Sequence, residues 1–429
     1  MKACRYFGLA LLLVTFGFLA VGCSSEEEQA NEDATQSAPS PGVTDTEIVL
    51  GTHLALSGSP AAASAPYADG MRAYFDYVNS QGGVHGRTIK LVVGDDHFSP
   101  SDAAEVLQQM VQQKHVFAIV GGMGDPVQLA VIDYLQEQGV PDLFVAAGVA
   151  RFSTPVEHTR IAMTNYDIET KIVSDYFKEN FAGKKMAILV PQTESGTGAL
   201  AAFEEGLKDS DIEIVETQSY DIVQSDVTAQ MQRLKAANPD FVYLWANVGV
   251  AANAIKVIRE VLSWDVPLFI SQVAATEILT ALTGPEAAEG IISMTPGKMI
   301  SETDDPAIQR HMELMRQFAP DVKPSGITLY GMTVAELAVQ ALKNAGPDLT
   351  RESFIEGAEK IRDYCCTFCL VPVNLSPTDH AVGEALFFEK AVNGNWVRQS
   401  DTPISLESTP GDVVACTGLG EPVHREDGQ

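Results

Sequence analysis

One glycine-rich stretch of the sequence has the residue types and spacing of a dinucleotide site. Residues Gly196 to Ala201 read GTGALA, which matches the pattern G-x-G-x-x-A, and Glu216 follows at about the distance of a ribose-binding acid. In that kind of site the glycines directly follow a strand, whereas Pro191 to Ser195 intervene here. We therefore expect no nicotinamide cofactor and no dehydrogenase activity.

Other catalytic patterns are missing from the sequence. It contains no G-x-S-x-G elbow, no H-E-x-x-H pair and no Walker loop. The eight histidines are scattered, and Asp95-Asp96-His97 is expected to be a solvated strand end rather than a metal site. We therefore expect a binding protein without cofactor or metal, and a secreted α/β enzyme is the distant alternative.

The four cysteines in the last quarter of the chain predict disulfides. Cys365, Cys366 and Cys369 form a cluster, and Cys416 follows far behind. In an oxidising compartment such cysteines pair, and a bond between two adjacent cysteines is strained. We expect Cys416 to join the C-terminal tail to the cluster; a zinc site that includes His380 is the alternative.

The N-terminal residues predict export. Lys2 and Arg5 precede an apolar run, residues 7–21, that is too short and too early to span a membrane in the mature protein. The run ends in AVGC, which resembles the lipobox of bacterial lipoproteins and makes Cys23 the lipidation site; an ordinary secretory signal is the alternative. Residues 24–42 are almost without apolar side chains and should form a flexible tether.

The net charge excludes one class of partner. The whole chain carries a formal charge of −29, and removal of Lys2 and Arg5 with the signal makes the remainder more acidic still. A polyphosphate would be repelled by such a surface, so nucleic acid is not expected as a partner. We expect an extracytoplasmic protein that touches the membrane through its lipid anchor only.

Strand-like and helix-like periodicity alternate through most of the chain. The predicted strands are 47–53, 88–93, 116–120, 143–146, 185–190, 213–218, 240–245 and 267–271. The predicted helices between them are 101–113, 126–138, 168–181, 198–208, 227–236 and 250–262. Short strands alternating with helices are typical of parallel sheets, so the sequence predicts an α/β fold with two Rossmann-like, doubly wound lobes.

The last third of the chain departs from this alternation. Residues 306–318 and 331–345 are predicted as helices that return to the first lobe, and Asn393-Gly394 is a hairpin signal between two short strands. The chain should thus cross between the lobes several times, first near residues 163–165. The predicted division is a signal peptide, 1–23; a tether, 24–42; a first lobe, 43–163 with about 293–372; a second lobe, 164–292 with about 373–410; and a tail, 411–429.

The topology predicts where a ligand would bind. Open parallel sheets bind ligands beyond the carboxyl ends of their strands, where helix N-termini present free N–H groups. The loops at these ends are 54–65, 121–126, 146–152, 191–198, 245–249 and 271–275, three in each lobe, and they are rich in small residues. Two lobes with such loops facing each other form a clamshell.

One stretch carries a family resemblance. Residues 79–87, NSQGGVHGR, with Asp95-Asp96 resemble the substrate-binding proteins of branched-chain amino acid ABC transporters. Shorter matches at comparable places are Leu56-Ser57-Gly58, Val120-Gly121 and Tyr330-Gly331-Met332-Thr333. The resemblance extends from about Thr46 to Val397. It implies the type I periplasmic binding protein fold: two lobes, joined by three crossings, that close on a small ligand and deliver it to a permease.

The resemblance also implies site residues. In amino-acid-binding members a Ser or Thr and backbone N–H groups after the third strand hold the ligand carboxylate, together with a stretch after the fourth strand. The corresponding residues here are Met123, Gly124 and Asp125, then Ala147, Gly148 and Val149. The second-lobe acid that meets the ligand ammonium falls on or near Gln272, and an aromatic position falls on Ser195.

These departures weaken the amino-acid interpretation. A carboxylate at Asp125 would repel a ligand carboxylate, and Gln272 cannot supply the charge that an ammonium group favours. A neutral, cationic or aromatic ligand is therefore favoured over a branched-chain amino acid. Asp125 also precedes Pro126, so its carboxylate is expected to cap the following helix, with or without a ligand contact.

Three further residues belong to the predicted site. Trp245 either stacks on a ligand or packs beneath the helices of its own lobe. Ser57 and Ser195 are loop hydroxyls for which a turn role is the alternative. The expected function is that of a monomeric, lipid-anchored solute-binding subunit of an ABC importer, with ABC permease subunits and a small molecule as partners. A sensory binding protein on the same fold is the alternative.

Overall fold

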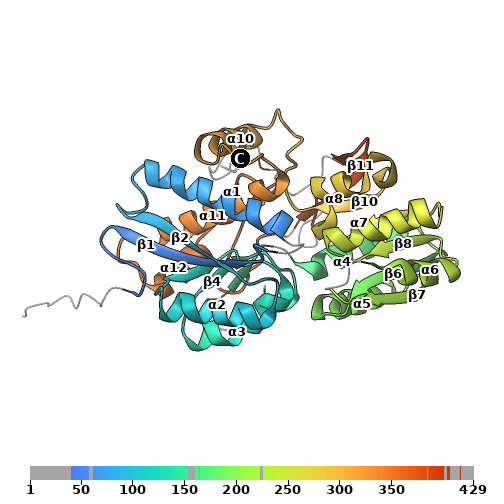
Figure 1. Cartoon of the computed structure of the whole chain (residues 1–429), viewed down its shortest axis with the longest axis horizontal. Helices are drawn as coiled ribbons and strands as arrows, with labels where there is room; N and C mark the ends of the chain where they lie inside the picture. Colours follow the sequence, from blue (N-terminus) through green and yellow to red (C-terminus); the bar gives the residue numbers. More distant parts are fainter. Residues whose placement is uncertain are drawn as a thin grey trace, which may run out of the picture. The chain divides into compact units, whose positions relative to one another are not determined.

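The computed structural model of the chain describes residues 40–57, 61–152, 160–163, 165–222, 226–383, 385–400, 403–405 and 416 (Figure 1). The predicted signal peptide, the lipidation site Cys23 and nearly all of the tether lie outside the described residues. The C-terminal tail lies outside them as well, apart from Cys416. Within the described part of the chain, no helix combines the length and the apolar character needed to cross a membrane.

The first half of the chain forms a five-stranded parallel sheet in the order β2-β1-β3-β4-β5. Its strands are β1 (Glu47–Leu54), β2 (Thr88–Asp95), β3 (Ala118–Val120), β4 (Asp142–Val145) and β5 (Arg160–Ala162). The strands β3 and β4 are buried along their whole length, as expected for a parallel sheet covered on both faces. The predicted doubly wound first lobe is confirmed, with β5 as a strand that was not predicted.

Helices cover both faces of this sheet (Figure 1). One face carries α1 (Ala61–Ser80), α10 (Pro306–Phe318), α11 (Gly326–Ala345) and α12 (Arg351–Glu359). The other carries α2 (Pro100–Gln112) and α3 (Asp125–Glu137). The helices α1 and α11 approach so closely that a Cβ at Gly70 would meet the backbone carbonyl of Thr328, and one at Gly331 that of Tyr67. The late helices thus return to the first lobe, as predicted.

The second sheet has the order β12-β11-β10-β9-β8-β6-β7, and β13 pairs with β11. Its strands are β6 (Lys185–Pro191), β7 (Glu213–Tyr220), β8 (Phe241–Leu244), β9 (Leu268–Ile270), β10 (Ile292–Thr295), β11 (Ala385–Val392), β12 (Asn395–Arg398) and β13 (Ile404–Ser405). The strands β6 to β10 are parallel, whereas β11 runs antiparallel to β10, β12 and β13. The Asn393-Gly394 turn joins β11 to β12, as predicted, with φ of 51° and 80°.

The second sheet is also covered on both faces. The helices α4 (Tyr166–Asn180) and α5 (Glu194–Leu207) pack on one face. The other face carries α6 (Thr228–Ala236), α7 (Val248–Lys256) with a π turn (Val257–Val261), α8 (Glu277–Thr283) and α9 (Pro285–Ala288). A core of phenylalanines, including Phe177, Phe203 and Phe241, fixes α4 and α5 on the sheet. Two α/β/α lobes result.

The predicted disulfides are present, and so is the predicted link between the C-terminal tail and the cysteine cluster. A disulfide joins Cys365 to Cys416, so the tail is fastened to the cluster, and a second disulfide joins Cys366 to Cys369. The backbone N–H of Cys416 also donates to the carbonyl of Leu370 at 2.9 Å. All four cysteines are therefore used in disulfides, which confirms that interpretation over a zinc site. His380, the other residue of the zinc alternative, lies 3.0 Å from the Glu359 carboxylate.

Candidate functional site

At the carboxyl ends of the first sheet, the carboxylate of Asp125 forms hydrogen bonds that hold the surrounding loops together. Oδ1 accepts hydrogen bonds from the backbone N–H groups of Gly148 at 3.1 Å and Val149 at 3.4 Å. Oδ2 accepts one from the hydroxyl of Tyr166 at 3.2 Å. The residue is 8% exposed. Asp125 thus fixes the loop after β4 to the start of α3.

The prediction that Asp125 caps its own helix is wrong. The N-cap of α3 is Gly124, at φ 106°, and no side chain caps this helix. Asp125 is the first helical residue, and its carboxylate turns to a loop more than twenty residues ahead. The helix begins one residue earlier than predicted, so Pro126 is its second residue rather than its first. A side chain at position 124 would collide with the ring of Phe98, so glycine fits this position.

The loops after β3 and β4 are joined by their backbones. The N–H of Ala146 donates to the carbonyl of Gly122 at 2.9 Å, and the N–H of Gly124 donates to the carbonyl of Ala146 at 3.1 Å. Met123 and Ala146 form an isolated parallel bridge. The N–H groups that point at Asp125 are therefore held in place by a regular backbone arrangement, which preorganises them for an anion.

Tyr166 covers this arrangement from the second lobe. Its ring lies against Gly148, where a Cβ would meet three ring carbons, and its backbone N–H donates to the Gly148 carbonyl at 2.8 Å. It also packs edge-on against Trp245, with 5.1 Å between ring centroids. Because Asp125 belongs to α3 and Tyr166 begins α4, their hydrogen bond connects helices that pack on different sheets.

A second buried carboxylate, Glu169, lies one turn further along α4. Oε1 accepts from the hydroxyl of Tyr243 at 2.8 Å and from the backbone N–H of Gln272 at 3.0 Å. Oε2 accepts from the side-chain amide of Gln272 at 2.9 Å and from Ser271 Oγ at 3.2 Å. Four donors thus saturate this carboxylate, which fastens α4 to the ends of β8 and β9.

The two buried carboxyl groups of Asp125 and Glu169 have raised pKa values. Burial raises the pKa of Asp125 and of Glu169, although the hydrogen bonds that each accepts oppose part of this effect. Burial, followed by the nearby charges of Asp125 and Glu169, raises the pKa of Tyr166 well above its ordinary value. Among the described residues, every hydrogen-bond donor to these two carboxylates is neutral.

The predicted second-lobe residues have mainly internal roles. Gln272 begins a 3₁₀ turn, Gln272–Ala274, and donates to Glu169, while its own Oε1 finds no partner among the described residues. Ser195 lies in the first turn of α5, and its Oγ is 3.1 Å from Thr193 Oγ1. Trp245 is 3% exposed and packs in the core of its lobe, which is the second of the two predicted alternatives and leaves little surface for stacking.

The predicted first-lobe residues differ in exposure. Ala147 is buried against Phe152, and the side chain of Met123 is half-buried, 3.8 Å from the hydroxyl of Ser64. Ser57 is exposed and its hydroxyl bonds to Asp95, a bond that helps the backbone N–H groups of His97 and Leu56 to hold the pKa of Asp95 low. Ser57 thus has the turn role that was its alternative.

The prediction that Asp95-Asp96-His97 is a solvated strand end holds only in part. Asp96 is fully buried, and its Oδ2 lies 2.8 Å from Nδ1 of His53, which is buried as well. Nε2 of His53 and both polar atoms of the Gln128 amide have no partner among the described residues, and the two side chains flank Gly122. In the described part of the chain, no three His, Cys, Asp or Glu side chains are placed to hold a metal ion.

The glycine-rich stretch that could have bound a dinucleotide lies inside a helix. The helix α5 begins at Glu194, four residues before its predicted start, so Gly196 is in its first turn. A Cβ at Gly196 would meet the carbonyl of Pro191, so this glycine permits close packing of α5 on β6. The loop after β6 is thus shorter than predicted, and its glycines serve packing.

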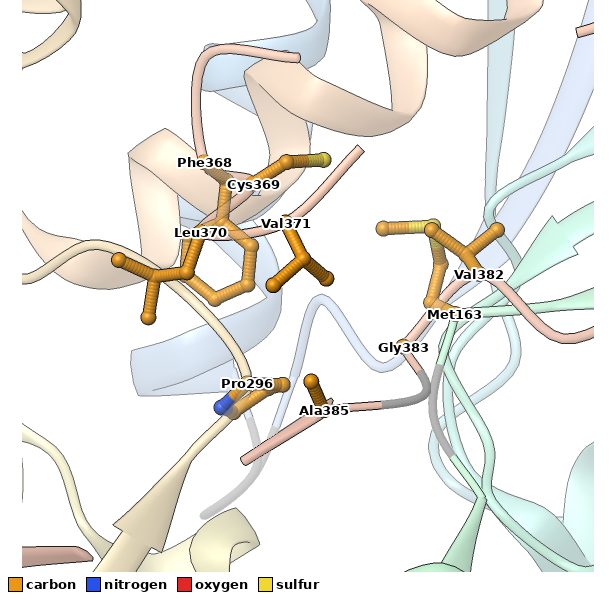
Figure 2. Close-up of a pocket in the computed structure, with 9 residues that line it drawn as sticks. All are labelled: Met163, Pro296, Phe368, Cys369, Leu370, Val371, Val382, Gly383 and Ala385. Atoms are coloured by element: carbon orange, nitrogen blue, oxygen red, sulfur yellow. The ribbon is translucent and has the colours of Figure 1, made fainter. Parts of the chain in front are cut away.

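A small apolar pocket lies where the segments between the lobes run together (Figure 2). Met163 follows β5, Pro296 follows β10, Val382 and Gly383 precede β11, and Ala385 is its first residue. The loop closed by the second disulfide packs on them: the carbonyl of Phe368 accepts from the N–H of Lys298 at 2.7 Å. The lining contains none of the predicted ligand residues, so this pocket belongs to the hinge.

The sequence prediction missed Tyr166, Glu169, Tyr243 and Ser271. Glu169 could have been found, because it lies three and four residues before Ile172 and Val173 and so shares the buried face of its helix. A carboxylate in that position needs partners, which marks it for attention. The sequence contains no comparable signal for Tyr166, whose importance depends on contacts with the loop after β4.

Comparison with known proteins identifies the family of this chain. A model of a family described as "Periplasmic binding protein" matches residues 47–395. A Leu/Ile/Val-binding protein homolog 2 of Brucella abortus is 26% identical over 312 residues, covering 71% of this chain and 80% of that protein. An amino acid binding protein of Pseudomonas aeruginosa is 23% identical over 304 residues, covering 70% of this chain and 79% of that protein.

Solved structures share the fold. A branched-chain amino acid ABC transporter protein of Thermus thermophilus with bound valine superposes with a TM-score of 0.76 at 20% identity, covering 85% of this chain and 97% of that one. A fatty acid ABC transporter substrate-binding protein of Thermomonospora curvata gives 0.77 at 23% identity, covering 86% and 95%. The fold and the family predicted from the sequence are confirmed: the chain belongs to the periplasmic binding protein family.

Proposed function

We propose that this chain is the lipid-anchored solute-binding subunit of an ABC importer. It captures a small organic molecule between the carboxyl-end loops of its two lobes and delivers it to a permease. Family membership supports this proposal, as do the lipobox-like end of the N-terminal apolar run and the likeness to proteins named as ABC transporter components.

One observation carries the proposal. The loops that would receive a ligand are connected across the lobes by the Asp125–Tyr166 hydrogen bond, next to segments that pass between the two sheets. Two lobes that meet through a few polar contacts near a hinge are suited to closing on a ligand. Family membership supports capture and release rather than turnover, and the hydroxyl of Ser271, which contacts the Glu169 carboxylate, is buried beneath the loops.

The relatives name more than one kind of ligand. Some relatives are named Leu/Ile/Val-binding proteins, whereas one solved structure is named for fatty acids. We propose that the ligand here is an amino-acid-like, amide or aromatic compound, because Met123 and Val149 offer apolar surface beside the polar group of Asp125.

A thermal-shift screen of the full chain tests the proposal. The compounds are amino acids, their amides, polyamines and aromatic acids. Each stabilising compound is recovered afterwards, and its molecular mass is measured by mass spectrometry. We expect at least one class to raise the melting temperature by several degrees and to be recovered unchanged. Chemical conversion of a stabilising compound would contradict a pure binding function.

A further inference from the structure

The N–H groups of Gly148 and Val149 form a cradle for one anion. They lie in the loop after β4, they converge on a single oxygen, and the N-terminus of α3 lies beside them. Converging backbone N–H groups next to a helix start are a general anion-binding arrangement. In this chain the anion is the carboxylate of Asp125 itself, so the cradle is filled from within.

The same cradle is closed from outside. The ring of Tyr166 lies on Gly148, its hydroxyl donates to Asp125, and Asp125 is only 8% exposed. A second carboxylate entering here would lie beside the first in a poorly solvated site, and two like charges at such a distance repel strongly. No described cation bonds to Asp125 to offset the repulsion.

What remains open in the loops is acceptor capacity. The Asp125 carboxylate accepts from Gly148, Val149 and Tyr166 and also from its own backbone N–H, so its roughly four acceptor positions are in use. The carbonyl oxygen of the Gln272 amide has no partner among the described residues. Glu169, the other buried acid, already accepts from four neutral donors. A ligand group that donates N–H would match the unpartnered amide oxygen of Gln272.

We propose that Asp125 is the specificity residue of this site: it excludes ligands that present a free carboxylate to the loop after β4 and selects those that present an amine or amide N–H. This inference rests on the proposed solute-binding function. It assigns the substrate class by chemistry, as nitrogen compounds whose recognised end is not a carboxylate.

Formate titration tests the cradle without knowledge of the ligand. The full chain is labelled with ¹⁵N, and the amide signals of Gly148 and Val149 are followed as sodium formate replaces sodium chloride at constant ionic strength. We expect no shift in the wild type and a saturable shift in Asp125→Ser, whose cradle is empty. Asp125→Asn serves as a second variant that keeps the size of the side chain, and Glu137→Gln, an exposed position on the same helix, is the matched control.

Matched ligand pairs test the selection. Leucine and leucinamide, and likewise phenylalanine and its amide, differ only at the carboxylate. We expect the wild type to prefer the amide at least tenfold in Kd, and Asp125→Ser to reverse or abolish the preference. Equal formate shifts in the wild type and in Asp125→Ser, no shift in either, or a wild type that prefers the acid would overturn the proposal. If no compound binds but formate enters the variant only, the solute-binding function fails while the closed cradle stands.

Discussion

The hydroxyl of Tyr166 lies 3.2 Å from Oδ2 of Asp125, and this bond joins the first residue of a helix on one sheet to the first residue of a helix on the other. The chain passes from one lobe to the other just before Tyr166. The bond therefore lies where relative movement of the lobes is smallest. Asp125 is thus placed both to shape the ligand loops and to connect the lobes near their hinge.

Loss of the Tyr166 hydroxyl should weaken this connection. Tyr166→Phe removes the only side-chain donor to Asp125 among the described residues but keeps the ring on Gly148, so we expect the free energy of unfolding to fall by about 1 kcal/mol. Urea unfolding measures the change. Tyr176→Phe is the matched control, because Tyr176 lies on the same helix and its hydroxyl has no hydrogen bond among the described residues. Equal losses in the two variants would argue against a role for the bond.

Replacement of Glu169 by Gln should be more costly. The amide cannot accept from all four donors, so at least one buried donor, such as that of Gln272 or Tyr243, loses its partner. We expect a loss of about 2 to 3 kcal/mol in the free energy of unfolding at pH 7. The exposed Glu179 on the same helix provides the control, and Glu179→Gln should change stability by less than about 0.5 kcal/mol. A loss no larger than that of the control would show that the network contributes little.

His311 should make the protein less stable in mild acid. It is buried between Thr328 Oγ1 at 3.0 Å and Met332 Sδ at 3.3 Å, and burial lowers its pKa from 6.5 to about 4. Between these two values the unfolded chain binds a proton that the folded chain does not. Stability is therefore unaffected above pH 6.5 and falls as the pH drops towards 4, by about 3 kcal/mol in total.

Comparison of the wild type with His311→Gln separates the contribution of His311 from those of the other titrating groups. We expect the difference between their free energies of unfolding to change by about 2 kcal/mol between pH 7 and pH 5, with the wild type losing more. Urea unfolding at the two pH values gives the difference. A constant difference would mean that the pKa of His311 is the same in the folded and the unfolded protein.

The two disulfides should contribute unequally. Cys365 and Cys416 are 51 residues apart, whereas Cys366 and Cys369 are 3 apart. Closure of the longer loop restricts the unfolded chain more, by about 4 kcal/mol against about 2 kcal/mol in the chain-entropy model. Thermal unfolding of the two double Cys→Ala variants ranks them. A larger loss from the short loop would indicate that its packing on the hinge segments, near Phe368, outweighs the entropy term.

The sequence predicted the elements whose pattern is long and regular. The strands β1, β2, β6 and β7 and the helix α10 have predicted and observed starts that agree, because each has at least seven residues of clear periodicity between turn residues. The strands β5 and β10 were missed, and their three or four residues alone do not explain it, because β3 and β9 are as short and were predicted.

The site was harder to predict than the fold. Asp followed by Pro is a local signal for a helix start, and it led to the interpretation of Asp125 as a cap. The actual partners, Gly148 and Tyr166, lie 23 and 41 residues further along the chain and become neighbours only in the folded sheet. The loop residues were identified through topology, whereas their hydrogen bonds depend on packing that no local pattern records.

The distance between the lobes during ligand titration tests the central claim most directly. Probes at the exposed positions Gln108 on α2 and Gln232 on α6 report it by pulsed electron resonance, with the most stabilising compound of the screen as titrant. A solute-binding clamshell predicts a single distance change that saturates at one ligand per chain, with the same midpoint as calorimetric binding. An unchanged distance at saturation, or conversion of the compound during the titration, would contradict it.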